Sequence, residues 1–152
     1  MSRLIVLDAG PVGLLGKAPG RPDAARCVAW VDALILAGDA VAVPEIARYE
    51  VRRELFRLGS SGSLARLDQL HPRLFRLPIT GEVMDMASEL WAEVRRAGLP
   101  TAADASLDGD AILAAQALVA EADWQDVIVA TGNVQHLGRF SGLDAQQWDL
   151  IR

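Results

Sequence analysis

The feature that most constrains the fold of this 152-residue chain is an aliphatic run at residues 4–7, Leu-Ile-Val-Leu, which ends at Asp8. A continuous aliphatic run is typical of a strand that is buried on both faces, as in a parallel sheet. Gly10 and Pro11 follow and prevent the strand from continuing. Asp8 is therefore predicted to lie at the carboxyl end of a central parallel strand, the edge at which open α/β sheets bind their ligands.

Strand-like and helix-like segments alternate along the rest of the chain. We expect strands at residues 3–7, 40–43, 74–77 and 127–130, and a fifth, edge strand at 148–151. We expect helices at residues 22–37, 45–58, 64–70, 108–120 and 134–137, and one that is capped by Thr80 and closed at 98–100. Residues 12–21 and 59–63 are predicted to be a Gly/Pro-rich loop and a flexible break. The alternation predicts a three-layer α/β/α domain with a four- to five-stranded, mainly parallel sheet, which occupies residues 1–152 as a single domain.

The amino-acid composition argues against a disordered protein and against a membrane protein. Hydrophobic residues make up 51% of the chain, which is too many for a disordered protein. The aliphatic runs are much shorter than a membrane span, and the N-terminus does not resemble a signal peptide, so no membrane association is expected. Cys27 is the only cysteine, which excludes an intramolecular disulfide. We therefore expect a protein of the reducing cytoplasm.

Charge is distributed unevenly along the chain. The net charge of −5 argues against indiscriminate binding of nucleic acid. Residues 48–76, however, contain seven arginines and three acids, whereas residues 82–126 contain ten acids and two arginines. Arginine suits bidentate contacts with phosphate, so the first region is a candidate for binding phosphate groups. A codon bias toward arginine in the source genome explains the same composition equally well.

Four polar side chains are predicted to meet at the carboxyl edge of the sheet. In a parallel sheet with right-handed crossovers, every crossover helix begins at that edge. Asp8 ends the first strand, and Glu50 lies about six residues into the helix after the second strand. Asp110 falls in the first turn of the helix before the fourth strand, and Asn133 lies just past that strand. The expected fold thus gathers three carboxylates and one amide.

Such a group of carboxylates suggests a metal site. Neighbouring carboxylates repel each other and raise each other's pKa unless a cation lies between them. Oxygen donors from Asp8, Glu50 and Asp110 favour Mg²⁺ or Mn²⁺. One or two such ions would activate a water, while Asn133 and Thr131 would orient that water or the metal's hydration shell. The two histidines are far apart in sequence and the single cysteine stands alone, so zinc is not indicated.

Each candidate also has a structural interpretation. Asp8 and Asn133 are common turn residues, and Glu50 is placed to form a solvated ion pair with Arg53. Asp108 and Asp110 suit the start of a helix, where acids favour the dipole. We prefer a capping role for Asp108. Asp110, in contrast, shares a helix face with residues that should pack on the sheet: Leu113, Ala114 and Ala117.

Four segments together resemble a known family. They are residues 4–8 (Leu-Ile-Val-Leu-Asp), 43–55 (from Val-Pro-Glu to Arg-Glu-Leu), 107–117 (from Leu-Asp-Gly-Asp to Ala-Gln-Ala) and 127–137 (from Val-Ile-Val-Ala-Thr-Gly-Asn to Gln-His-Leu). In order and spacing they resemble a PIN-domain nuclease of the VapC toxin kind, over nearly the whole chain. The family's three acids fall on Asp8, Glu50 and Asp110, and its fourth position, Asp or Asn, falls on Asn133.

The resemblance implies a PIN-like fold and a Mg²⁺- or Mn²⁺-dependent endoribonuclease that is usually dimeric and is neutralised by a cognate antitoxin. It also makes Asp108 a plausible auxiliary residue. One position departs from the family: Gly10 stands where Ser or Thr is common, so a hydroxyl that could orient water or metal is missing. The alternative is a PIN-fold module with little or no catalytic activity that binds RNA or a protein partner.

Overall fold

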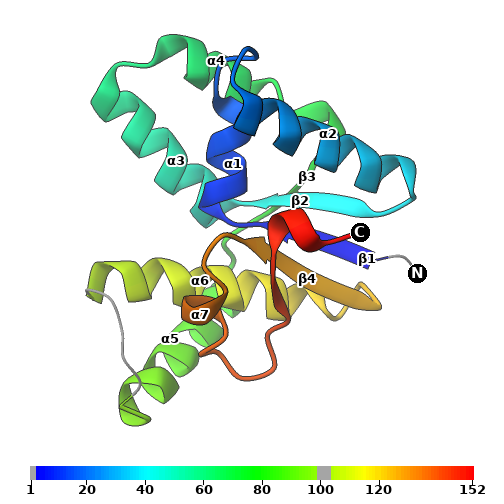
Figure 1. Cartoon of the computed structure of the whole chain (residues 1–152). Helices are drawn as coiled ribbons and strands as arrows, with labels where there is room; N and C mark the ends of the chain where they lie inside the picture. The colour runs from blue at the N-terminus through cyan, green and yellow to red at the C-terminus, as the bar shows by residue number, and fades with distance from the viewer. Residues whose placement is uncertain (1–2, 99–103) are drawn as a thin grey trace.

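The computed structural model describes residues 3–98 and 104–152, which form a five-stranded sheet flanked by helices (Figure 1). The strands are β1 (Arg3–Leu7), β2 (Ala40–Pro44), β3 (Phe75–Leu77), β4 (Asp126–Thr131) and β5 (Ala145–Gln147). Their order in the sheet is β3-β2-β1-β4-β5, and every strand pairing is parallel. The predicted α/β class, parallel sheet and central position of the first strand are confirmed.

Helices cover both faces of the sheet. They are α1 (Ala9–Gly16), α2 (Pro22–Leu36), α3 (Glu45–Leu58), α4 (Ser61–Asp68), α5 (Gly81–Arg96), α6 (Asp104–Ala120) and α7 (Val134–Leu137), with 3₁₀ turns at His71–Arg73 and Trp148–Leu150. Figure 1 shows α1 to α4 on one side of the sheet and α5 to α7 on the other. Within the described residues, none of these helices has the length and apolarity that a membrane crossing requires.

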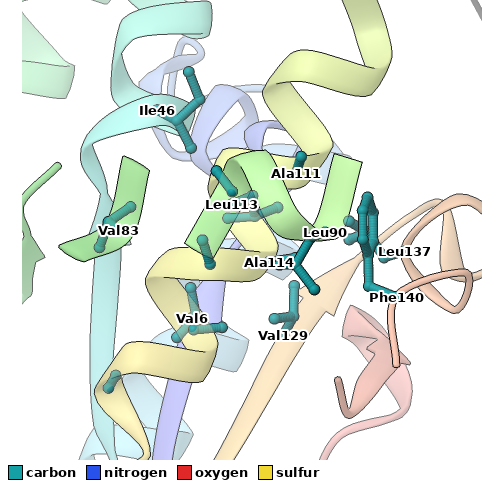
Figure 2. Close-up of a cluster of buried hydrophobic side chains, with 14 of the residues drawn as sticks. Val6, Ile46, Val83, Leu90, Ala111, Leu113, Ala114, Val129, Leu137 and Phe140 are labelled. Carbon is teal, nitrogen blue, oxygen red and sulfur yellow. The ribbon is translucent and has the colours of Figure 1, made fainter. Parts of the chain in front are cut away.

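The central strand explains the three layers. Leu4, Ile5, Val6 and Leu7 are all fully buried. Because side chains alternate along a strand, Ile5 and Leu7 join the core under α1 and α2, whereas Leu4 and Val6 join the core under α5 and α6. Figure 2 shows the second of these cores, in which Val6 lies among side chains from α5, α6 and β4.

The carboxyl edge of the sheet is where the loops and helix starts converge. In Figure 1 the strand arrows point to the left, and α1 and α3 begin there directly after β1 and β2. Helix α6 also begins on that side and runs back along the sheet before β4. The topology predicted from the alternation of strands and helices therefore places β1, α3 and α6 at one edge.

Two predicted loop regions are helical instead. Residues 12–21 were expected to be a loop, but α1 begins immediately after Asp8. Pro11 lies in the first turn, where a missing N–H breaks no helical hydrogen bond, and Val12 and Leu15 are buried against the sheet. The predicted break at 59–63 is shorter than expected, because Gly59 ends α3 in the left-handed conformation (φ 68°) and α4 starts at Ser61.

Two further boundaries differ from the prediction. The edge strand β5 is Ala145–Gln147, not residues 148–151; Trp148 instead turns inward and packs edge-on against Trp30, with ring centroids 5.2 Å apart. Helix α6 begins at Asp104, so Asp108 is not its cap. Thr80 caps α5 as predicted, through a bond from Val83 N to its hydroxyl. Of the expected closure at 98–100, Leu99 and Pro100 lie outside the described residues.

Candidate active site

Asp8 is held by two hydrogen bonds at the junction between β1 and α1. Its Oδ1 accepts from the backbone N–H of Ala9 at 2.7 Å, which makes Asp8 the N-cap of α1. Its Oδ2 accepts from the Thr131 hydroxyl at 2.7 Å, and the same hydroxyl accepts from the N–H of Asn133 at 2.9 Å. The carboxylate at the end of β1 is thereby oriented by the end of β4, the adjacent strand.

Glu50 projects from the second turn of α3, and its side chain is 29% exposed. Burial raises the pKa of this carboxyl, and the negative charges of Asp8 and Asp110 raise it further. Arg53 opposes this effect, with its Nη2 3.9 Å from Glu50 Oε2. The ion pair between Glu50 and Arg53 that the sequence suggested is thus present. The charges of Asp8 and Asp110, the two other carboxylates of the predicted site, also act on the pKa of Glu50.

Asp110 lies on α6 with its side chain 24% exposed. Burial, followed by the charge of Asp8, raises the pKa of Asp110 to about 6. Arg139 and His136 act in the opposite direction; the Arg139 Nη2 donates to Asp110 Oδ2 at 3.2 Å. Because α6 begins at Asp104, Asp110 is two turns into the helix rather than in its first turn.

The fold therefore brings the three predicted carboxylates into one electrostatic unit. Asp8 acts on the pKa of both Glu50 and Asp110, and Asp110 acts on that of Glu50. Across residues 3–98 and 104–152, no three acidic, histidine or cysteine side chains form a ready-made metal cage. The donor set nevertheless fits a hard divalent cation, because the oxygen ligands carry repelling charges that such an ion offsets. Binding an ion between them requires these side chains to draw closer.

The remaining predicted site residues have different positions. Asn133 lies at the start of α7 with an exposed side chain that makes no capping bond, so it is available beside Thr131. Asp108 is exposed and lines a shallow groove with Met84 and Trp91 of α5. Two residues along a helix rotate a side chain by about 200°. Asp108 therefore does not share a face with Asp110, and the structure does not bring it to the carboxylate group.

Two residues that support the site were not predicted from the sequence. Arg139 is almost fully buried, with 7% of its side chain exposed, and its Nε also donates to the carbonyl of His136 at 2.7 Å. It places a positive charge against Asp110. The sequence signal was weak, since Arg139 follows the fourth segment of the resemblance and only the three-dimensional fold shows its partner.

Gln116 is the second unpredicted residue. It is 2% exposed on α6, accepts from the N–H of Ile46 at 3.4 Å, and donates to the carbonyls of Leu77 and Pro78 at 2.8 and 3.1 Å. These bonds join α6 to the first turn of α3 and to the end of β3. Gln116 therefore fixes the two helices that carry Asp110 and Glu50. A polar residue on an otherwise apolar helix face was the available signal.

Comparison with known proteins agrees with this architecture. A chain of the VapBC2 complex from Rickettsia felis bound to a promoter DNA fragment is similar over 95% of this chain and 98% of that one, with 16% identity and a TM-score of 0.75. For VapBC from Salmonella typhimurium bound to DNA the coverages are 97% and 99%, with 17% identity and a TM-score of 0.72. For FitAcB from Neisseria gonorrhoeae they are 97% and 99%, with 20% identity and a TM-score of 0.67.

At these identities the solved structures establish the fold. No curated protein matches the chain in sequence. The model of the PIN domain family, in contrast, matches residues 6–133, a span that includes Asp8, Glu50, Asp110 and Asn133. The sequence match, the parallel sheet order and the gathering of three carboxylates at its carboxyl edge agree, and this chain belongs to the PIN domain family.

Proposed function

We propose that this chain is a metal-dependent endoribonuclease, the toxin of a toxin–antitoxin pair. The observation that carries the proposal is that, at the edge of a PIN-family sheet, the charge of Asp8 raises the pKa of both Glu50 and Asp110, and that of Asp110 raises the pKa of Glu50. Raised pKa values from burial and like charges are characteristic of functional sites. A structural ion-pair network does not need three carboxylates that repel one another.

Mg²⁺ or Mn²⁺ would be held by Asp8, Glu50 and Asp110. When bound, such an ion supplies an activated water and neutralises charge that develops on the phosphate. The Thr131 hydroxyl and the Ala9 N–H keep the Asp8 carboxylate oriented, so one ligand is arranged in advance. The exposed amide of Asn133 would orient a water or substrate oxygen. Although Gly10 lacks a hydroxyl, Thr131 places one on the first acid of the site.

RNA would approach along the outer side of α3. A groove of about 590 Å³ lies there, lined by arginines and two exposed aromatic residues: Arg48, Arg52, Arg53, Arg76, Tyr49 and Phe56. Arg53 connects this groove to the acids, because its guanidinium lies 3.9 Å from Glu50 and 5.1 Å from the centroid of the Tyr49 ring. Arginine and aromatic side chains contact phosphates and stacked bases of single-stranded RNA.

The structural relatives support a proposal about the antitoxin partner. VapBC and FitAB complexes share this fold, so we propose that a cognate antitoxin binds and inhibits this chain, which itself forms a homodimer. We place the protein in the cytoplasm, because its one cysteine, Cys27, is a buried free thiol. We also propose that residues 1–152 form one PIN-like domain.

The proposal is tested with purified protein and fluorescently labelled single-stranded RNA. We expect cleavage in Mn²⁺, none in excess EDTA, and at least about 100-fold slower cleavage for Asp8→Asn. Asp123→Asn is the control, since this exposed residue follows α6 at the opposite edge of the sheet. Equal cleavage in EDTA, or full activity of Asp8→Asn, would contradict the nuclease proposal. RNA binding without cleavage by the wild-type protein would favour the inactive PIN-fold module instead.

A further inference from the structure

Helix α6 contains a glycine where the backbone does not require one. Gly109 is buried between Asp108 and Asp110 in a 17-residue helix that includes six alanines. It is not among the described glycines with positive φ, which are Gly38, Gly59, Gly98 and Gly142. Glycine weakens a helix interior relative to alanine. The atoms that pack against position 109 therefore have to explain the glycine.

The carboxylate of Glu50 occupies the space that a side chain at position 109 would fill. A Cβ built on Gly109 would lie 2.9 Å from Glu50 Oε2, a distance that real Cβ atoms essentially never show. The next nearest atoms are Glu50 Cδ at 3.4 Å and Oε1 at 3.6 Å. All three of the nearest heavy atoms thus belong to one carboxylate. Close packing of the α3 and α6 backbones does not explain the glycine.

We propose that Gly109 is a positioning residue for the Glu50 carboxylate. Its bare Cα lets a carboxylate that starts on α3 come to rest against α6, one residue from Asp110. An alanine at position 109 would push that carboxylate away from α6, because the carboxylate is the free end of a flexible side chain and the helix is not. Alanine would also strengthen α6 itself. Gly109→Ala is therefore expected to stabilise α6 and, at the same time, to displace the Glu50 carboxylate.

The position of the carboxylate matters to the function through the proposed metal site, and to that extent this inference rests on the proposed function. Glu50 would have to draw toward Asp8 and Asp110 around one ion. Displacement of a ligand, or of the group that orients it, typically lowers metal affinity by about 10- to 100-fold. Gly109 has no side chain that could bind a metal, and the nearest atoms to a Cβ built on it are those of the Glu50 carboxylate, so its effect would pass through Glu50.

The test is a double-mutant cycle of Gly109→Ala and Glu50→Ala on the metal-free protein, read by thermal unfolding. On the Glu50→Ala background we expect Gly109→Ala to raise Tm by about 2–4 °C, the usual effect of removing a helical glycine in a chain of this size. With Glu50 present we expect less than about half of that rise, because the carboxylate must move. An equal rise on both backgrounds would overturn the proposal.

The second measurement is Mn²⁺ affinity by calorimetry. Gly109→Ala should bind Mn²⁺ at least about 10-fold more weakly than wild type although it is no less stable. Gly13→Ala, in α1 with only Val51 Cγ2 at 4.0 Å from the added carbon, is the control and should bind normally. Unchanged Mn²⁺ affinity in Gly109→Ala would contradict the proposal. If wild type itself bound no Mn²⁺, the proposed function would fail, and the unfolding cycle would still decide whether Gly109 positions Glu50.

Discussion

Replacing Asp110 with asparagine should stabilise the metal-free protein. The folded state raises the pKa of Asp110 from 3.8 to about 6, a value that already includes the opposing effect of Arg139. The native carboxyl therefore holds its proton more tightly than the unfolded one, and the protein loses stability as pH rises from about 4 through 6. At about 1.4 kcal/mol per pKa unit, the ionised carboxylate costs about 3 kcal/mol at pH 7.5. Asparagine carries no charge, so Asp110→Asn avoids the free-energy cost of an ionised carboxylate at this position.

Urea unfolding in EDTA at two pH values measures this difference. We expect the free energy of unfolding of Asp110→Asn to exceed that of wild type by about 3 kcal/mol at pH 7.5 and by about 1 kcal/mol at pH 4.5, where the native carboxyl is almost fully protonated and only the unfolded-state carboxyl is largely ionised. Asp108→Asn is the matched control, since this exposed neighbour on the same helix should change stability by less than about 0.5 kcal/mol. A pH-independent difference, or destabilisation at pH 7.5, would refute the conclusion that repulsion and burial strain this site.

Two further substitutions test the groups that support the acids. Thr131→Val removes the hydroxyl that donates to Asp8 and accepts from the N–H of Asn133. Mn²⁺ calorimetry should show about 10-fold weaker binding, and unchanged affinity would mean that Thr131 does not support the metal site. Gln116→Leu leaves the N–H of Ile46 and two carbonyls without their side-chain partner; urea unfolding should show a loss of about 2–3 kcal/mol, whereas a loss below about 0.5 kcal/mol would mean that this bridge does not tie α6 to α3.

The parts of the fold that were predictable from the sequence are those set by local pattern. The aliphatic run before Asp8 indicated β1, and α3 has the bounds that the sequence predicted, because Pro44 and Gly59 mark its two ends. The order of elements then placed the starts of α3 and α6 at the edge where β1 ends. This convergence needed only the handedness of parallel crossovers.

What was not predictable depends on tertiary contacts. Glycine and proline in residues 9–16 hid α1, whose helical form depends on the burial of Val12 and Leu15 against the sheet. Likewise, packing between Trp30 and Trp148 turned the predicted edge strand into a 3₁₀ turn. The contact between Arg139 and Asp110 joins residues 29 positions apart, and no local pattern specifies it.

The proposed nuclease depends on one divalent cation that the carboxylates of Asp8, Glu50 and Asp110 share. Anomalous diffraction from a crystal soaked in Mn²⁺ tests it directly, because the scattering locates the ion without reference to activity. We expect an anomalous peak about 2.1 Å from carboxylate oxygens of these residues, and loss of that peak in Asp8→Asn. A peak elsewhere, or no peak at Mn²⁺ concentrations that support RNA cleavage, would contradict it.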